Sequence, residues 1–255
     1  MGLKAAPEDQ ALLLDLQALD TKLQQLARKA EKLPEREVVD ALAAKRGELE
    51  RTRVEQSGAV EDARLELKRT ESDVEVVDAR IVRDAERLRT STSVKDVAAL
   101  EQELEALGRR KSDLEDIELA VMETVEQREG DLAATDGELA TLAADLAEAT
   151  TARDAALAEI EAERAHATAN RQTVVAKVPA DLLALYEKQR ERYGIGASHL
   201  RGGVSSASGV ALAHTDMTKI RAAEPDDVIL CPDSSAILVR TAESGLPART
   251  AESEL

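Results

Sequence analysis

The chain of 255 residues contains no Phe or Trp, has only two Tyr, and carries a formal net charge of −17. Aromatic side chains normally supply a thick globular core because each buries a large apolar area, so this composition argues against such a core. Its many Ala, Leu, Glu, Asp and Arg residues are typical of long helices that meet along a thin seam. The negative charge also repels nucleic-acid phosphates, except at a local basic patch.

The sequence predicts no contact with a membrane. No run of 18 apolar residues is present, and such a run is the minimum for a spanning helix. The first ten residues turn acidic before the apolar core of a signal peptide could form. A cytoplasmic location is therefore the default expectation. The single cysteine, Cys231, leaves no partner for an intrachain disulfide.

The first expected helix runs from Pro7 to Leu33. Proline fits the first turn of a helix, and Glu8 and Asp9 complement the helix dipole there. Pro34 then breaks or kinks the helix, because the residue before a proline is pushed out of the α region. Apolar residues at alternating spacings of three and four predict a coiled-coil seam. They are Leu12, Leu16, Leu19, Leu23, Leu26, Ala30 and Leu33.

Two longer helices follow, separated by the four hydroxylated residues Thr90–Ser93. Such residues compete for backbone hydrogen bonds and favour turns and helix caps. The helix before this segment begins at Pro34, and the helix after it ends before Pro179. Their seams include Val60, Ala63, Leu67, Val74, Val77 and Ile81 in the first, and Leu100, Leu104, Leu107, Leu114, Val121 and Val125 in the second.

A short polar turn between two long heptad helices predicts an antiparallel helical hairpin. We expect its tip at residues 90–95 and the whole hairpin within residues 7–178. Pairing the helices outward from the tip places the first helix beside the end of the third. The alternative that remains is a parallel homodimeric coiled coil, so the sequence leaves monomer and dimer open.

The chain changes character after Pro179. We expect a short amphipathic helix and linker over residues 179–196, a small β-rich module over residues 197–242, and a flexible tail over residues 243–255. Two β-prone runs lie in the module, Val228–Leu230 and Ala236–Val239. The predicted fold class is thus mostly α, a long antiparallel coiled-coil hairpin followed by a small β-rich module.

Three segments carry a resemblance to a known family. They are Leu-Tyr-Glu-Lys-Gln-Arg at residues 185–190, the stretch that follows Ser93, and Cys-Pro-Asp-Ser-Ser-Ala-Ile-Leu at residues 231–238. The chain resembles bacterial proteins with a coiled-coil hairpin and a C-terminal zinc ribbon, whose second knuckle reads C-P-x-C-G-x-I-L. The resemblance implies four cysteine ligands in two knuckles. Here Cys231 remains, and Ser205, Ser208 and Ser234 stand at the other three positions.

A serine hydroxyl is a poor zinc ligand at neutral pH, so we expect a degenerate zinc-ribbon-like module without metal or cofactor. The alternative is a mixed site in which Cys231 is joined by nearby residues; the candidates are His199, His214, Asp216 and Asp233. Cys231 is expected to be a buried thiol rather than a nucleophile, because no cation flanks it. Without metal, the module would be held together by Ile220, Val228, Leu230, Ile237 and Val239.

The sequence predicts that the protein is not an enzyme. It has no phosphate-binding loop and no nucleophile elbow, and its carboxylates stand beside Lys and Arg at helical spacings, as on solvated faces.

Two function classes remain. One is a scaffold, adaptor or chaperone-like protein that binds protein partners, because the resemblance implies links to transcription and secretion components. The other is weak nucleic-acid binding by the module through Arg201, Lys219 and Arg221, because one relative is linked to messenger RNA. Insertion of the tip into RNA polymerase is disfavoured because Asp96 is the only carboxylate there.

Overall fold

The structure is a computed structural model that describes residues 2–246, and its helices follow the sequence pattern closely. Helix α1 (Pro7–Glu31) ends before Pro34, where α2 (Pro34–Thr90) begins. Helix α3 (Val94–Val175) follows after only three residues. The remaining elements are α4 (Ala180–Tyr193), β1 (Ala197–Arg201), β2 (Val204–Ser205), α5 (His214–Ala222), β3 (Ile237–Val239) and the 3₁₀-helix η1 (Ala242–Ser244).

The contacts of the chain separate into two units. The hairpin unit contains residues 34–153, and the terminal unit contains the described residues up to 33 and from 154 onward. Helix α3 contributes to both. These units are divided at residues 33/34 and 153/154, where the sequence predicted no domain boundary. They therefore do not test the expected domain boundaries, which stay predictions.

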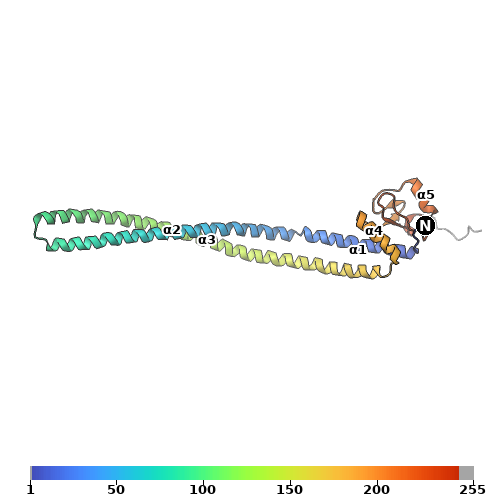
Figure 1. The fold of residues 1–255 in the computed structure, drawn as a ribbon, viewed down its shortest axis with the longest axis horizontal. Helices are drawn as coiled ribbons and strands as arrows, with labels where there is room; N and C mark the ends of the chain where they lie inside the picture. Colours follow the sequence, from blue (N-terminus) through green and yellow to red (C-terminus); the bar gives the residue numbers. More distant parts are fainter. Residues whose placement is uncertain (1, 247–255) are drawn as a thin grey trace, which may run out of the picture. The chain divides into compact units, whose positions relative to one another are not determined.

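In the hairpin unit, α2 and α3 run antiparallel on either side of a turn at residues 91–93 (Figure 1). Ion pairs between the two helices show the register, because the partner's number falls as the residue number in α2 rises. They are Arg53 with Asp136 at 2.6 Å, Arg64 with Glu129 at 2.6 Å, and Asp78 with Lys111 at 2.6 Å. The predicted antiparallel hairpin is confirmed, and its turn lies within the residues where the tip was expected.

The core of the hairpin unit is a single seam. Val60 and Ala63 of α2 are buried, as are Leu114, Val121 and Leu142 of α3. Each helix therefore buries one stripe and leaves its other faces exposed, as the heptad spacing predicts. Within residues 2–246, no helix has both the length and the apolar character needed to cross a membrane.

In the terminal unit, α1 packs against the last turns of α3. Leu26 and Leu33 form a buried cluster with Ile160, and Lys22 lies 3.6 Å from Glu163. The prediction that the first helix lies beside the end of the third is confirmed. Helix α4 ends at Gly194, which adopts the left-handed conformation (φ 81°) that favours glycine at a helix C-terminus.

The module contains a three-stranded sheet in the order β2-β1-β3. Strands β1 and β2 are antiparallel, and β1 and β3 are parallel, with Ser198 opposite Leu238. The N-terminal residues join this module: the Ala5 N–H donates to Asp226 O at 2.8 Å, and the Val228 N–H donates to Leu3 O at 3.0 Å. One face of the sheet contributes to a core with α1 and α4, which includes Leu13, Leu16, Leu182, Tyr186, Ala197, Ile237 and Val239.

Several expectations for the module differ from the structure. Residues 228–230 form only an isolated bridge, in which Leu230 pairs with Ile237. Leu230 was expected in the core but is 42% exposed, because side chains alternate along extended backbone and the next residue, Cys231, points inward. Residues 242–244 form η1, which the Ser244 hydroxyl ties to the sheet by donating to Leu200 O at 2.7 Å. Residues 247–255 of the predicted tail lie outside the described residues.

Candidate functional site

The structure brings two of the predicted knuckle residues together inside the module. Ser205 and Cys231 are both buried, and the Cys231 thiol donates to Ser205 Oγ at 3.5 Å. The Ser205 hydroxyl also shares a hydrogen bond of 2.7 Å with the buried Ser198 hydroxyl. A cluster of hydroxyl groups thus surrounds the thiol.

The two segments that were predicted as knuckles fold alike. In the first, the Gly209 N–H donates to Ser205 O at 2.8 Å and the Val210 N–H donates to Ser208 Oγ at 3.3 Å. In the second, the Ser235 N–H donates to Cys231 O at 2.9 Å and the Ala236 N–H donates to Ser234 Oγ at 3.4 Å.

Each turn ends in a left-handed residue, Gly209 at φ 67° in the first and Ser235 at φ 59° in the second. Non-glycine residues rarely adopt this conformation. Ser235 stands where the C-P-x-C-G pattern has glycine, and its left-handed backbone is one that glycine adopts without strain.

The environment of Cys231 alters its thiol. Burial would raise the pKa, but hydrogen bonds from the Ser205 and Ser234 hydroxyls and from the backbone N–H groups of Asp233 and Ser234 outweigh it, so the pKa is lowered. The side chain is only 1% exposed. It is therefore a buried thiol, as expected.

These residues do not fit a structural zinc ion. The knuckle positions offer one thiol and three hydroxyls, whereas structural zinc requires thiolate or imidazole ligands. The Ser205 hydroxyl is already engaged with Ser198. The mixed site is not assembled either, because among residues 2–246 no three His, Cys, Asp or Glu side chains lie close enough to share an ion. Both ring nitrogens of His199 are engaged, Nε2 with Thr241 at 2.7 Å and Nδ1 with Arg201 at 3.2 Å.

The three cations suggested for nucleic-acid contact have different surroundings. Arg201 lies 2.8 Å from the Glu243 carboxylate, and Lys219 lies 3.3 Å from Asp216. Arg221, by contrast, forms no ion pair within the described part of the chain. A neighbouring carboxylate thus offsets two of the three charges, which weakens the case for a phosphate-binding patch.

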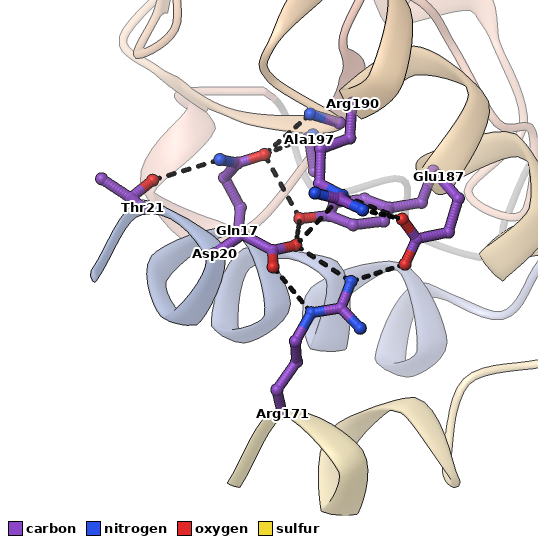
Figure 2. A network of polar contacts seen from close by, with 9 residues as sticks. Gln17, Asp20, Thr21, Arg171, Glu187, Arg190 and Ala197 are labelled. Atoms are coloured by element: carbon purple, nitrogen blue, oxygen red, sulfur yellow. Dashed lines mark hydrogen bonds and ion pairs between the residues drawn. The ribbon is translucent and has the colours of Figure 1, made fainter. Parts of the chain in front are cut away.

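A second polar cluster, which sequence reasoning missed, lies where α1, α3 and α4 of the terminal unit meet (Figure 2). Its centre is the buried carboxylate of Asp20. Arg171 donates to Asp20 through Nε at 2.6 Å and Nη2 at 3.2 Å. The Tyr186 hydroxyl donates to Asp20 Oδ2 at 2.7 Å, and Arg190 lies 3.5 Å from the same oxygen. We call this group the Asp20 network.

Glu187 completes the charge balance of the Asp20 network. It accepts from Arg171 at 2.5 Å and from Arg190 at 2.6 Å. Burial would raise the pKa of Glu187, but the hydrogen bonds from these two arginines lower it overall. Burial, together with the hydrogen bond to Asp20, raises the pKa of Tyr186 far above its usual value. Two carboxylates and two guanidinium groups therefore neutralise one another.

Beside the network, Gln17 of α1 holds the first strand of the module. Gln17 Oε1 accepts from the Gly196 N–H at 2.7 Å and from the Ala197 N–H at 3.2 Å (Figure 2). A Cβ atom on Gly196 would lie 2.5 Å from ring carbons of Tyr186, so only glycine lets the ring approach the backbone this closely. These contacts fix the module to the helices of the terminal unit.

The sequence matches the family model described as the CT398-like coiled-coil hairpin domain over residues 16–194. This range contains α2, α3 and α4 with the tip and every residue of the Asp20 network. The chain belongs to the CT398-like coiled-coil hairpin family.

Three similar proteins support this assignment. An uncharacterised protein of Mycobacterium tuberculosis is 35% identical over 239 residues, which cover 93% of this chain and 98% of that protein. A structurally characterised protein from Mycobacterium smegmatis is 34% identical, with a TM-score of 0.85 over 93% of this chain and 100% of the other. CT398 from Chlamydia trachomatis is 18% identical and covers 91% of this chain and 97% of its own, with a TM-score of 0.67, which shows a common fold.

Proposed function

We propose that this member of the CT398-like family is a non-enzymatic adaptor or chaperone-like protein that binds protein partners through its helices and its C-terminal module. The observation that carries the proposal is the Asp20 network. Its buried carboxylate and two arginines lock α1, α3 and α4 together. Beside it, Gln17 of α1 holds the module through the backbone N–H groups of Gly196 and Ala197. A fixed module presents a preorganised surface, which lowers the cost of ordering on binding.

The hairpin unit supplies a second surface. Because α2 and α3 share one seam, most of their side chains face solvent, and several are large and apolar. Val54, Leu65, Val76 and Leu119 are all exposed. Exposed helical faces of this kind are available to helices of a partner, as in other helical recognition modes.

The test is a pull-down from native lysate with the full chain as bait, with and without nuclease. The adaptor role predicts a protein partner that is retained in near-equal amount after nuclease treatment at physiological salt. If every captured protein disappears with nuclease, the partner is a nucleic acid and the adaptor proposal is wrong.

Nucleic-acid binding is the second candidate, and we expect it to be weak. Because phosphate contacts release counterions, affinity for single-stranded RNA or duplex DNA should fall steeply with added salt. Submicromolar binding at physiological ionic strength, abolished by charge reversal at Arg201 and Arg221, would favour this candidate over the adaptor.

A further inference from the structure

A hollow of about 230 Å³ lies beside the end of α5 in the terminal unit. The side chains of Ile220 and Leu246 and the ring of Pro7 form apolar walls, and the guanidinium groups of Arg221 and Arg240 line it as well. Among residues 2–246, no Asp or Glu lines this hollow. In a chain of net charge −17, two arginines without a lining carboxylate form a local positive site. We call it the Arg221 hollow.

Arg240 is a fixed part of the Arg221 hollow. Its Nη2 donates to the backbone oxygens of residues 224, 225 and 227 at 2.7, 3.1 and 2.7 Å, and its Nη1 donates to the oxygen of residue 223 at 3.3 Å. The carboxylates of Asp227 and Asp226 attract Arg240 electrostatically, but they also lie near Lys4, at 3.7 and 3.0 Å from its Nζ. Backbone dipoles thus hold the guanidinium in place, and its charge adds to the positive potential.

Arg221 differs because its guanidinium is exposed and forms no ion pair with any residue that the structure describes. It also lines a second hollow of about 370 Å³, together with His214, Met217 and Ser244. A guanidinium offers five N–H donors in a planar fork that matches a carboxylate. Arg221 therefore stands between two hollows with its donors available to a ligand.

We propose that the Arg221 hollow binds a short segment of a partner protein in which a carboxylate stands next to a large apolar side chain. The carboxylate pairs with Arg221, and the apolar side chain packs against Ile220 and Leu246. The inference rests on the adaptor function proposed above and names the chemistry of the partner. The hollow is smaller than a typical cofactor pocket and suits one or two side chains.

Nucleic acid fits the same surface less well. A phosphate would also pair with Arg221, but among residues 2–246 no aromatic ring lines the hollow, so a base has nothing to stack on there. The apolar walls are better matched by an aliphatic side chain, whose burial is favourable. We therefore assign the site to a protein segment.

The test uses the full chain and labelled synthetic peptides, with fluorescence anisotropy at physiological salt. The probe peptide alternates Leu and Glu. One control peptide replaces Glu with Gln, and a second replaces Leu with Ser. We expect the Leu/Glu peptide to bind more tightly than both controls, and Arg221→Gln to weaken it about tenfold, the usual effect of losing one charge-assisted hydrogen bond. Lys219→Gln is the matched control, since it removes one charge from the same helix at a side chain that does not line the hollow.

Each outcome decides the proposal. It is overturned if the Glu and Gln peptides bind equally, if Arg221→Gln and Lys219→Gln have the same effect, or if a single-stranded RNA of equal charge displaces the Leu/Glu peptide. Repeating the pull-down with Arg221→Gln separates the two proposals. If the wild type and the variant retain a partner equally, the adaptor proposal stands, but the Arg221 hollow is not the site that binds the partner. The absence of any protein partner removes the adaptor role itself.

Discussion

Replacing Tyr186 by Phe tests how much the Asp20 network stabilises the terminal unit. The substitution keeps the buried ring and removes only the hydroxyl, which donates to the Asp20 carboxylate at 2.7 Å. Hydrogen bonds to charged groups contribute about 1.5–3 kcal/mol. In the variant, Asp20 keeps its two hydrogen bonds from Arg171, so the carboxylate is not left unpaired. The free energy of unfolding should therefore fall by about 2 kcal/mol. For a protein of this size, that corresponds to a fall in Tm of about 4–8 °C.

The second tyrosine, Tyr193, supplies the control for this experiment, and the near-UV signal of Tyr186 supplies the probe. Tyr193 is 46% exposed and donates no hydrogen bond within the described residues, so Tyr193→Phe should leave the Tm unchanged. Since the chain lacks Trp and has only two Tyr, thermal melting followed by near-UV circular dichroism of the Tyr193→Phe variant reports the surroundings of Tyr186 alone. Equal melting temperatures for the two Phe variants would show that the hydroxyl of Tyr186 contributes nothing to stability.

Four further predictions concern the fold. Gly196→Ala should prevent the module from docking, because its Cβ would overlap the buried tyrosine ring. Gly130→Ala should instead stabilise the protein by about 1 kcal/mol, since that position is helical and open; urea unfolding distinguishes the two. The pKa of Glu187 is lowered in the folded state, so its contribution to stability is present above its ordinary value and is lost as the pH falls. Glu187→Gln should therefore flatten the loss of stability in acid, measured as unfolding free energy against pH. Cysteines at Leu88 and Val97 should cross-link within one chain, and cross-links found only between chains would contradict the hairpin.

The coiled coil could be predicted because its information is local and periodic. The spacing of Val60, Ala63 and their partners fixes a helical stripe, and Thr90–Ser93 interrupt it at one place. Proline and glycine mark helix ends through backbone sterics alone, as at Pro34 and Gly194. These signals are local and do not depend on tertiary contacts with distant parts of the chain.

The Asp20 network could not be predicted in the same way. Asp20 and Arg171 are 151 positions apart, and each looks like an ordinary charge on a solvated helical face. Only the packing of α1 against the end of α3 brings them together. The one local signal was Tyr186, a buried aromatic with a polar end in a chain almost without aromatics, since such hydroxyls usually find a partner.

The module was the least predictable part because its elements are short. Helix α5 was missed, although Asp216 in its first turn and Lys219 and Arg221 in its last complement the helix dipole. Strand β2 has only two residues and is defined by pairing with β1 rather than by its own sequence. The β-prone run at 228–230 was overestimated, since Val228 and Ile229 pack against the two cores without forming a strand and only Leu230 forms a bridge.

The last prediction concerns the two knuckle turns. In a tetrahedral zinc site with Zn–S bonds of about 2.3 Å, two sulfur atoms lie about 3.8 Å apart. Cys231 Sγ lies 3.5 Å from Ser205 Oγ, so the turns are already close to this spacing. We therefore expect the wild-type chain to contain no stoichiometric zinc, and the triple variant Ser205→Cys, Ser208→Cys, Ser234→Cys to bind about one zinc per chain in elemental analysis. The control is a triple variant that has its first new cysteine at Ser206 instead of Ser205. Because this moves one thiol by a residue, the control should not bind zinc. Zinc in the wild type that is lost on mutating His199 or His214 would establish the mixed site. A triple variant without zinc would show that the turns do not face each other as the hydroxyl cluster indicates.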